Sequence, residues 1–172
     1  MFLNFIKDFS LKKIVKKTLS NYKAVASNGE IATVGIVLDE TYFKDKEALI
    51  GKLVQAGVKR SNIETLSYLD KLKKGEQPDC CHFTRKDITS DGDFSKDDVK
   101  AFINKSFDLL ISYYDVAKPP LVLATLKSGA KFKVGFATVD NRLNSFIIAS
   151  QAERYEEFTE ELIKYLKILN KL

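Results

Sequence analysis

The stretch that decides the fold is residues 107–136, which read FDLLISYYDVAKPPLVLATLKSGAKFKVGF. The apolar run at each end has the composition of a strand that is covered on both faces, as in a parallel sheet. Between the two runs, Pro119 and Pro120 suit the first turn of a helix, and Gly129 follows the position where that helix ends. The stretch therefore predicts a strand, a helix and a second, parallel strand.

Apolar runs and helical spacing alternate in the same way along the rest of the chain, which predicts an α/β fold. We expect a three-layer Rossmann-like domain over residues 29–172, with a mostly parallel sheet of four to five strands. Two capping boxes, Ser95 with Asp98 and Ser150 with Glu153, predict the first residues of two helices. The expected strands are 31–38, 63–69, 107–113 and 131–136, and the candidates for a further, shorter strand lie near 82–84 and at 146–149; the expected helices are 2–20, 44–56, 95–104, 119–128 and 150–169.

The strand, apolar helix and Gly-Ala-Lys turn of residues 107–136 resemble part of the N-terminal domain of heptosyltransferase-like glycosyltransferases. That resemblance implies the fold but not the activity, because such transferases need a second nucleotide-binding domain, for which we expect no room here. The whole chain is also similar to an uncharacterised bacterial family of small half-Rossmann proteins, a resemblance that implies no function.

The net charge of +5 is concentrated at the start of the chain. Residues 1–28 hold one carboxylate, Asp8, while the acidic and basic side chains of residues 29–172 balance. We therefore expect a basic amphipathic helical arm with a linker over 1–28, attached to a neutral body. Its lysines are the predicted nucleic-acid-binding residues: Lys7, Lys12, Lys13, Lys16, Lys17 and Lys23.

Three interpretations of this arm stay open. The lysines can contact RNA phosphates, either in free RNA or in a ribonucleoprotein such as the ribosome; the absence of arginine from the arm favours contacts to the backbone over base reading. Alternatively, Phe2, Leu3, Phe5, Ile6 and Phe9 can enter the headgroup region of a membrane while the lysines pair with anionic lipid. The helix can also dock its apolar side on the body and leave its lysines in water.

Ligands of open α/β sheets bind at the carboxyl ends of the strands, where the strand order reverses. The polar residues that follow the expected strands are therefore the possible ligand pocket, and a pair of carboxylates there would also suit a small enzyme. These residues are Asp39, Glu40, Thr41, Tyr114, Asp115, Lys118, Asp140 and Arg142.

The motifs of the common activities are absent from the sequence. No glycine-rich dinucleotide or phosphate loop occurs, and no G-x-S-x-G nucleophile motif. Cys80, Cys81 and His82 lack the spacing of a zinc site, so we expect no cofactor and no metal. The sequence favours a protein without catalysis.

The adjacent cysteines suit a reducing compartment, and no apolar stretch is long enough to span a bilayer. We therefore expect a cytoplasmic RNA- or ribosome-associated binding protein, tethered by its basic helix. The alternatives are a peripheral membrane protein that uses the same helix, or an enzyme with a carboxylate site.

Overall fold

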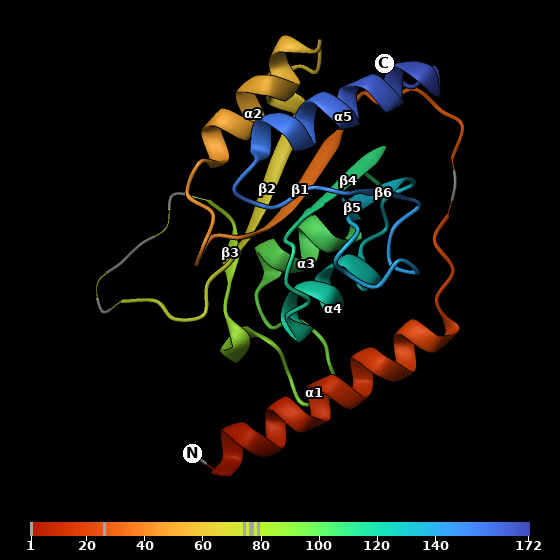
Figure 1. The fold of residues 1–172 in the computed structure, drawn as a ribbon. Helices are drawn as coiled ribbons and strands as arrows, with labels where there is room; N and C mark the ends of the chain where they lie inside the picture. Colours follow the sequence, from red (N-terminus) through yellow and green to blue (C-terminus); the bar gives the residue numbers. More distant parts are fainter. Residues whose placement is uncertain (1, 26, 74, 76–77, 79) are drawn as a thin grey trace.

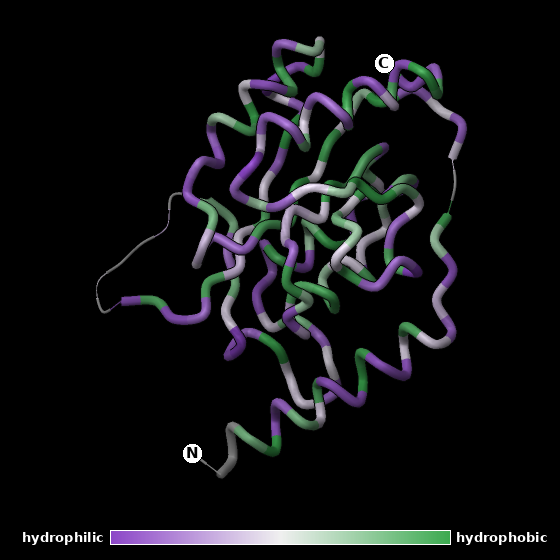
Figure 2. Tube along the Cα trace, viewed as in Figure 1, coloured by the Kyte–Doolittle hydropathy of each residue, from purple (hydrophilic) through white to green (hydrophobic). Residues whose placement is uncertain are grey.

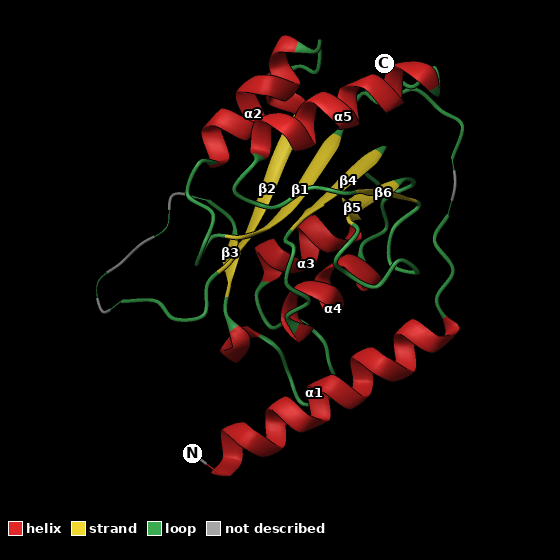
Figure 3. Ribbon diagram, viewed as in Figure 1, coloured by secondary structure: helices red, strands yellow, loops and turns green. Residues whose placement is uncertain are grey.

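The fold is a six-stranded parallel sheet with helices on both faces (Figures 1 and 3). The computed structural model describes residues 2–25, 27–73, 75, 78 and 80–172, and for residues 2–4 the backbone alone. The strand order is β3-β2-β1-β4-β5-β6, and every neighbouring pair is parallel. The strands are β1 (Val34–Asp39), β2 (Ile63–Tyr68), β3 (His82–Phe83), β4 (Leu109–Tyr113), β5 (Lys133–Phe136) and β6 (Phe146–Ile148).

Five α-helices lie in the described part of the chain. One pair, α2 and α5, packs together over one face of the sheet, while α3 and α4 cover the other face. The first helix, α1, lies outside that second layer and contacts α4 (Figure 1). The helices are α1 (Phe2–Asn21), α2 (Lys46–Gln55), α3 (Asp97–Asn104), α4 (Pro119–Lys127) and α5 (Tyr155–Ile168).

The core lies on both faces of the sheet because its central strands are mostly apolar and are buried along their whole length. All residues of β1, β4 and β5 are buried, as expected for strands covered by helices on either side. The hydrophobic segments accordingly gather in the middle of the molecule (Figure 2). Gly35 of β1 allows close packing between the sheet and the segment before β4, since a Cβ atom there would lie 2.7 Å from the Phe107 ring.

The structure confirms the α/β class and the parallel sheet, but it has six strands instead of the four to five that we expected. The two edge strands are only two and three residues long, so each gives a weak sequence pattern. The two predicted capping boxes, at the starts of α3 and α5, are not formed. The Ser95 hydroxyl donates to the Asp87 carbonyl, and α5 begins at Tyr155, beyond both Ser150 and Glu153.

The helix α1 is continuous, and its second half packs on the body. Leu11, Val15 and Leu19 are buried in the same core cluster as the sheet. By contrast, Phe5 and Phe9 are 71% and 66% exposed. The apolar residues of α1 therefore do not share one face. The two-residue step from Phe9 to Leu11 turns about 200° around a helix with 3.6 residues per turn, so these two side chains face opposite sides.

Candidate functional site

The strand order reverses between β1 and β4, so the loops that leave their carboxyl ends run to opposite sides. From β1 the chain continues to β2 and β3 on one side, then returns across the sheet to β4, β5 and β6 on the other. Open α/β sheets bind their ligands in the crevice between two such loops. A cavity of about 180 Å³ lies at this point.

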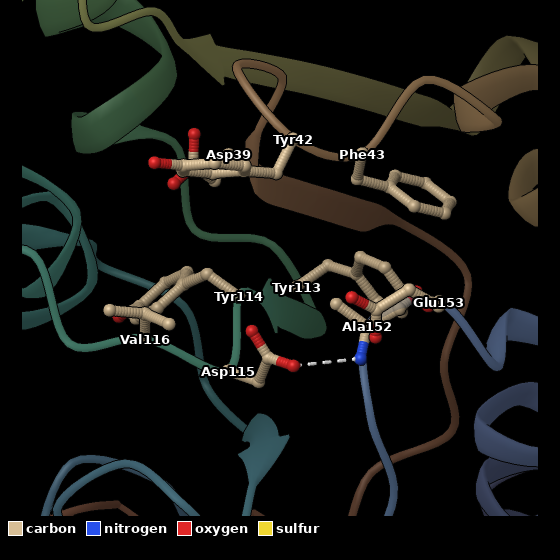
Figure 4. Close-up of a pocket in the computed structure, with 9 residues that line it drawn as sticks. All are labelled: Asp39, Tyr42, Phe43, Tyr113, Tyr114, Asp115, Val116, Ala152 and Glu153. Atoms are coloured by element: carbon tan, nitrogen blue, oxygen red, sulfur yellow. Dashed lines mark hydrogen bonds between the residues drawn. The ribbon is translucent and has the colours of Figure 1, made fainter.

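Residues from three segments line this cavity, which we call the switch-point cavity. They come from the end of β1 and the loop after it, from the end of β4, and from the turn before α5. Asp39 and Tyr42 lie on one side, and Asp115 lies across from them (Figure 4). The lining residues are Asp39, Tyr42, Phe43, Tyr113, Tyr114, Asp115, Val116, Ala152 and Glu153.

Lys118 holds the β1 side of the cavity together. Its Nζ lies 2.8 Å from Asp39 Oδ2 and 2.9 Å from Asp70 Oδ2, so one ammonium group faces two carboxylates. It also lies over the Tyr42 ring, 4.5 Å from the centroid. Burial alone would lower the pKa of Lys118, but its hydrogen bonds to the two aspartates raise that pKa above its ordinary value. Lys118 therefore stays charged, and the charge of Asp39 is compensated.

On the other side of the cavity the carboxylates have no such cation. Asp115 accepts a hydrogen bond from the Ala152 N–H at 3.0 Å through one oxygen, while its other oxygen faces the cavity (Figure 4). Within the described part of the chain, neither Asp115 nor Glu153 forms an ion pair. Burial raises the pKa of Tyr113, and the charges of Asp115, Glu153 and Asp45 raise it further. This side of the cavity is thus negatively charged.

Four of the predicted pocket residues come together here: Asp39, Tyr114 and Asp115 in the wall, and Lys118 directly behind it. The Tyr114 ring lines the cavity, but its hydroxyl bonds to Thr125 inside the body at 2.7 Å. The other predicted residues do not line the cavity. Thr41 accepts a hydrogen bond from the Asp70 N–H, Glu40 pairs with Lys46 at 3.5 Å, and Asp140 and Arg142 pair with each other at 2.6 Å.

Sequence reasoning missed most of the remaining wall. Tyr42 and Phe43 directly follow the predicted loop residues, so extending that segment by two positions would have found them. Glu153 was missed because its place in a capping-box pattern assigned it a structural role. In the structure Glu153 lies before the first turn of α5 and is exposed at the rim.

The Lys118 ammonium group already lies between Asp39 and Asp70, the position that a metal ion bound by both carboxylates would take. Among the described residues, no group of three or more His, Cys, Asp or Glu side chains is arranged to hold a metal ion.

The thiol of Cys81 is not a reactive group. Burial, together with the charge of Asp98 and a hydrogen bond to it, raises the pKa of Cys81 to about 12, so the thiol stays protonated at neutral pH.

The second candidate site is the side of α1 that faces away from the body, which we call the α1 solvent face. Phe5, Phe9, Lys13 and Lys17 follow one another at four-residue spacing, and all four are exposed. The only carboxylate of α1, Asp8, lies elsewhere, paired with Arg85 at 2.8 Å. The remaining predicted lysines, Lys7, Lys12, Lys16 and Lys23, are exposed as well.

The parallel sheet in the order 3-2-1-4-5-6, with a cavity where that order reverses, places this protein in the class of Rossmann-like α/β proteins. The chain belongs to a family of unknown function, DUF6913, whose family model matches residues 7–169. This agrees with the expected uncharacterised family, while the likeness of residues 107–136 to glycosyltransferases is unconfirmed. Searches of the curated proteins and of the solved structures found no significant match. Of the helices in the described residues, none has the length and apolar character to cross a bilayer.

Proposed function

We propose that this protein attaches to an anionic membrane surface through the α1 solvent face. The observation that carries the proposal is the exposure of Phe5 and Phe9 in the same row as Lys13 and Lys17. An aromatic side chain in water gains free energy when it enters the headgroup region, and each nearby lysine adds about 1 kcal/mol of attraction to anionic lipid.

The docking of α1 supports this proposal because it leaves the binding side free. Leu11, Val15 and Leu19 hold the opposite side of the helix against the body. The Arg85 guanidinium adds a hydrogen bond to the Lys7 carbonyl at 2.6 Å. The helix can therefore meet a membrane as a preformed element, with no ordering cost for its second half.

RNA is the second candidate, favoured by the lysines alone. Exposed lysines on a helix suit phosphate contacts, and phenylalanine rings can stack on bases. Ile6, however, is 48% exposed beside the two phenylalanines and has no ring to stack. Two aromatic side chains with an aliphatic one next to them fit the apolar boundary of a membrane better than they fit a chain of phosphates.

The free thiols of Cys80 and Cys81 suit a reducing compartment, so the proposal includes a cytoplasmic location. Catalysis has no part in it.

Co-sedimentation with vesicles tests the proposal. We expect the full-length protein to pellet with vesicles of phosphatidylcholine and phosphatidylglycerol but not with phosphatidylcholine alone, and pelleting to fall as salt rises. The Phe5→Ser/Phe9→Ser and Lys13→Gln/Lys17→Gln variants should each bind about thirty-fold more weakly. The matched control, Lys164→Gln/Lys167→Gln, removes the same charge from the exposed side of α5 and should bind normally.

Two other outcomes would contradict attachment through the aromatic side chains of the α1 solvent face. Salt-sensitive pelleting with ribosomes and none with anionic vesicles would transfer the α1 solvent face to RNA. Vesicle binding that the Phe5→Ser/Phe9→Ser variant leaves intact would show that the attachment is electrostatic only.

A further inference from the structure

The switch-point cavity has a chemistry of its own, independent of α1. Nucleotide-binding Rossmann proteins place phosphates at this position, on a glycine-rich loop and a helix N-terminus. Here the loop after β1 contains no glycine and reads DETYFKDK over residues 39–46. Three carboxylates and no lysine or arginine belong to the described residues that line the cavity. A phosphate at this position would be repelled.

Basic residues next to the cavity do not compensate the negative charge of its lining. Lys118 is shared between Asp39 and Asp70, which leaves that group of three with one net negative charge. Asp115 and Glu153 add two more on the opposite side. Arg154, the next residue, points its guanidinium at Glu157, 3.5 Å away, rather than into the cavity. The cavity therefore attracts a cation.

The walls between these carboxylates are aromatic. Phe43 and Tyr113 pack at 4.6 Å between ring centroids, and the Tyr113 hydroxyl is fixed by a 2.7 Å hydrogen bond to the Ala152 carbonyl. Tyr42 is 74% exposed at the mouth. One ammonium group, that of Lys118, already lies over the Tyr42 ring, so this ring is placed to stabilise a positive charge.

We propose that the switch-point cavity binds a small organic cation, a primary or quaternary ammonium compound. The aromatic rings contact its methyl or methylene groups and the face of its charge, while Asp115 and Glu153 compensate that charge. The cavity of about 180 Å³ is smaller than the usual range for drug-sized ligands, so the ligand has few heavy atoms.

Nuclear magnetic resonance titration of the ¹⁵N-labelled full-length protein tests this inference. The probes are choline and putrescine, with potassium chloride at equal ionic strength as the blank. The control ligand is 3,3-dimethylbutan-1-ol, which has the shape of choline without the charge. We expect at least one cation to shift the backbone amides of Tyr42, Phe43, Asp115, Ala152 and Glu153, and the neutral alcohol to leave them in place.

Matched variants assign the effect to the cavity. Glu153→Gln removes one charge at the rim and should weaken cation binding about three-fold, and Asp115→Asn/Glu153→Gln about ten-fold. Asparagine at 115 keeps an oxygen for the Ala152 N–H, so the turn before α5 stays in place. Glu160→Gln makes the same charge change on the exposed side of α5 and should change nothing.

Three results would overturn the inference. They are equal shifts with choline and its neutral analogue, unchanged affinity in the Asp115→Asn/Glu153→Gln variant, and no shift of these amides with either cation. Failure of vesicle binding would not bear on it, since α1 contributes no residue to the cavity.

Discussion

The α1 solvent face and the switch-point cavity are both aromatic, yet they carry opposite charges. On α1, Phe5 and Phe9 precede Lys13 and Lys17, and the one acidic group of the helix is turned away and paired with Arg85. In the cavity, Tyr42, Phe43 and Tyr113 stand among three carboxylates. The neutral sum of charges over residues 29–172 therefore hides a local acidic site. Net charge by segment therefore identifies the basic region and misses the acidic one.

The largest effect is expected from separating α1 from the body. Val15→Asp places a carboxylate in the buried contact and should lower the free energy of unfolding by about 3 kcal/mol, measured by chemical denaturation. The neighbouring Lys16→Asp changes an exposed position and should stay within about 0.5 kcal/mol. Equal stabilities would mean that α1 does not pack on the body, and the two regions would then not be parts of one rigid fold.

Lys133 differs from the lysines of α1 because its side chain is buried, whereas theirs are exposed. It lies 5.0 Å from the Tyr22 ring and donates to the Thr125 carbonyl at 2.6 Å. Burial lowers its pKa from 10.5 to about 8, so between these values the unfolded chain binds more protons than the folded one. Stability relative to Lys133→Met should rise by about 2 kcal/mol from pH 8 to pH 10. A flat difference between the two denaturation curves would contradict this burial.

The two ends of β4 compare a structural aspartate with a site aspartate. Asp108 accepts hydrogen bonds from the Thr33 and Lys131 side chains and from two backbone N–H groups, whereas Asp115 accepts one. Burial opposes ionisation of Asp108, but these bonds outweigh it and lower its pKa to about 2. Its stabilisation is therefore present above pH 4 and lost as pH falls to 2.

We accordingly expect Asp108→Asn to cost about 2 kcal/mol at pH 7 and almost nothing at pH 2, by urea denaturation. Asp115→Asn should cost less than about 1 kcal/mol at pH 7, because the amide oxygen replaces the one acceptor in use. Similar costs for the two substitutions at pH 7 would remove the distinction between the two ends of the strand.

The smallest effect concerns the fit of α1 against the loop before α3. Gly92 has φ +81°, and a Cβ atom there would lie 2.9 Å from Ile14 Cγ2. Gly92→Ala should therefore cost about 1 kcal/mol in thermal denaturation. Gly51, where a Cβ atom meets nothing, is the matched control, and Gly51→Ala should be neutral or stabilising. If both changes were neutral, the contact at Ile14 would be loose.

The strands were predictable because burial on both faces leaves nearly continuous apolar runs such as 31–38. The helix starts were not, since Ser150 and Glu153 satisfy a capping pattern by spacing alone, and the chain instead turns there to close the cavity. Phe9 and Leu11 face opposite sides of α1 because they are two residues apart. The position of an apolar residue in the sequence does not by itself show which side of the helix it faces.

The cavity was predictable in position but only partly in composition. The topological rule selects the ends of β1 and β4, and so found Asp39 and Asp115. It also selected Asp140 and Arg142, which follow β5 and bind each other. No local sequence pattern predicts that Glu153 lines the cavity, because it belongs to a segment 38 residues beyond Asp115 in the sequence.

Tryptophan fluorescence tests whether the protein attaches to membranes through the α1 solvent face. The chain contains no tryptophan, so Phe9→Trp and Tyr42→Trp each place a single reporter, one on the α1 solvent face and one at the mouth of the cavity. On addition of phosphatidylglycerol-containing vesicles, the emission of Trp at position 9 should shift to the blue while that at position 42 stays constant. A constant spectrum at position 9, or equal shifts at both positions, would contradict membrane attachment through α1.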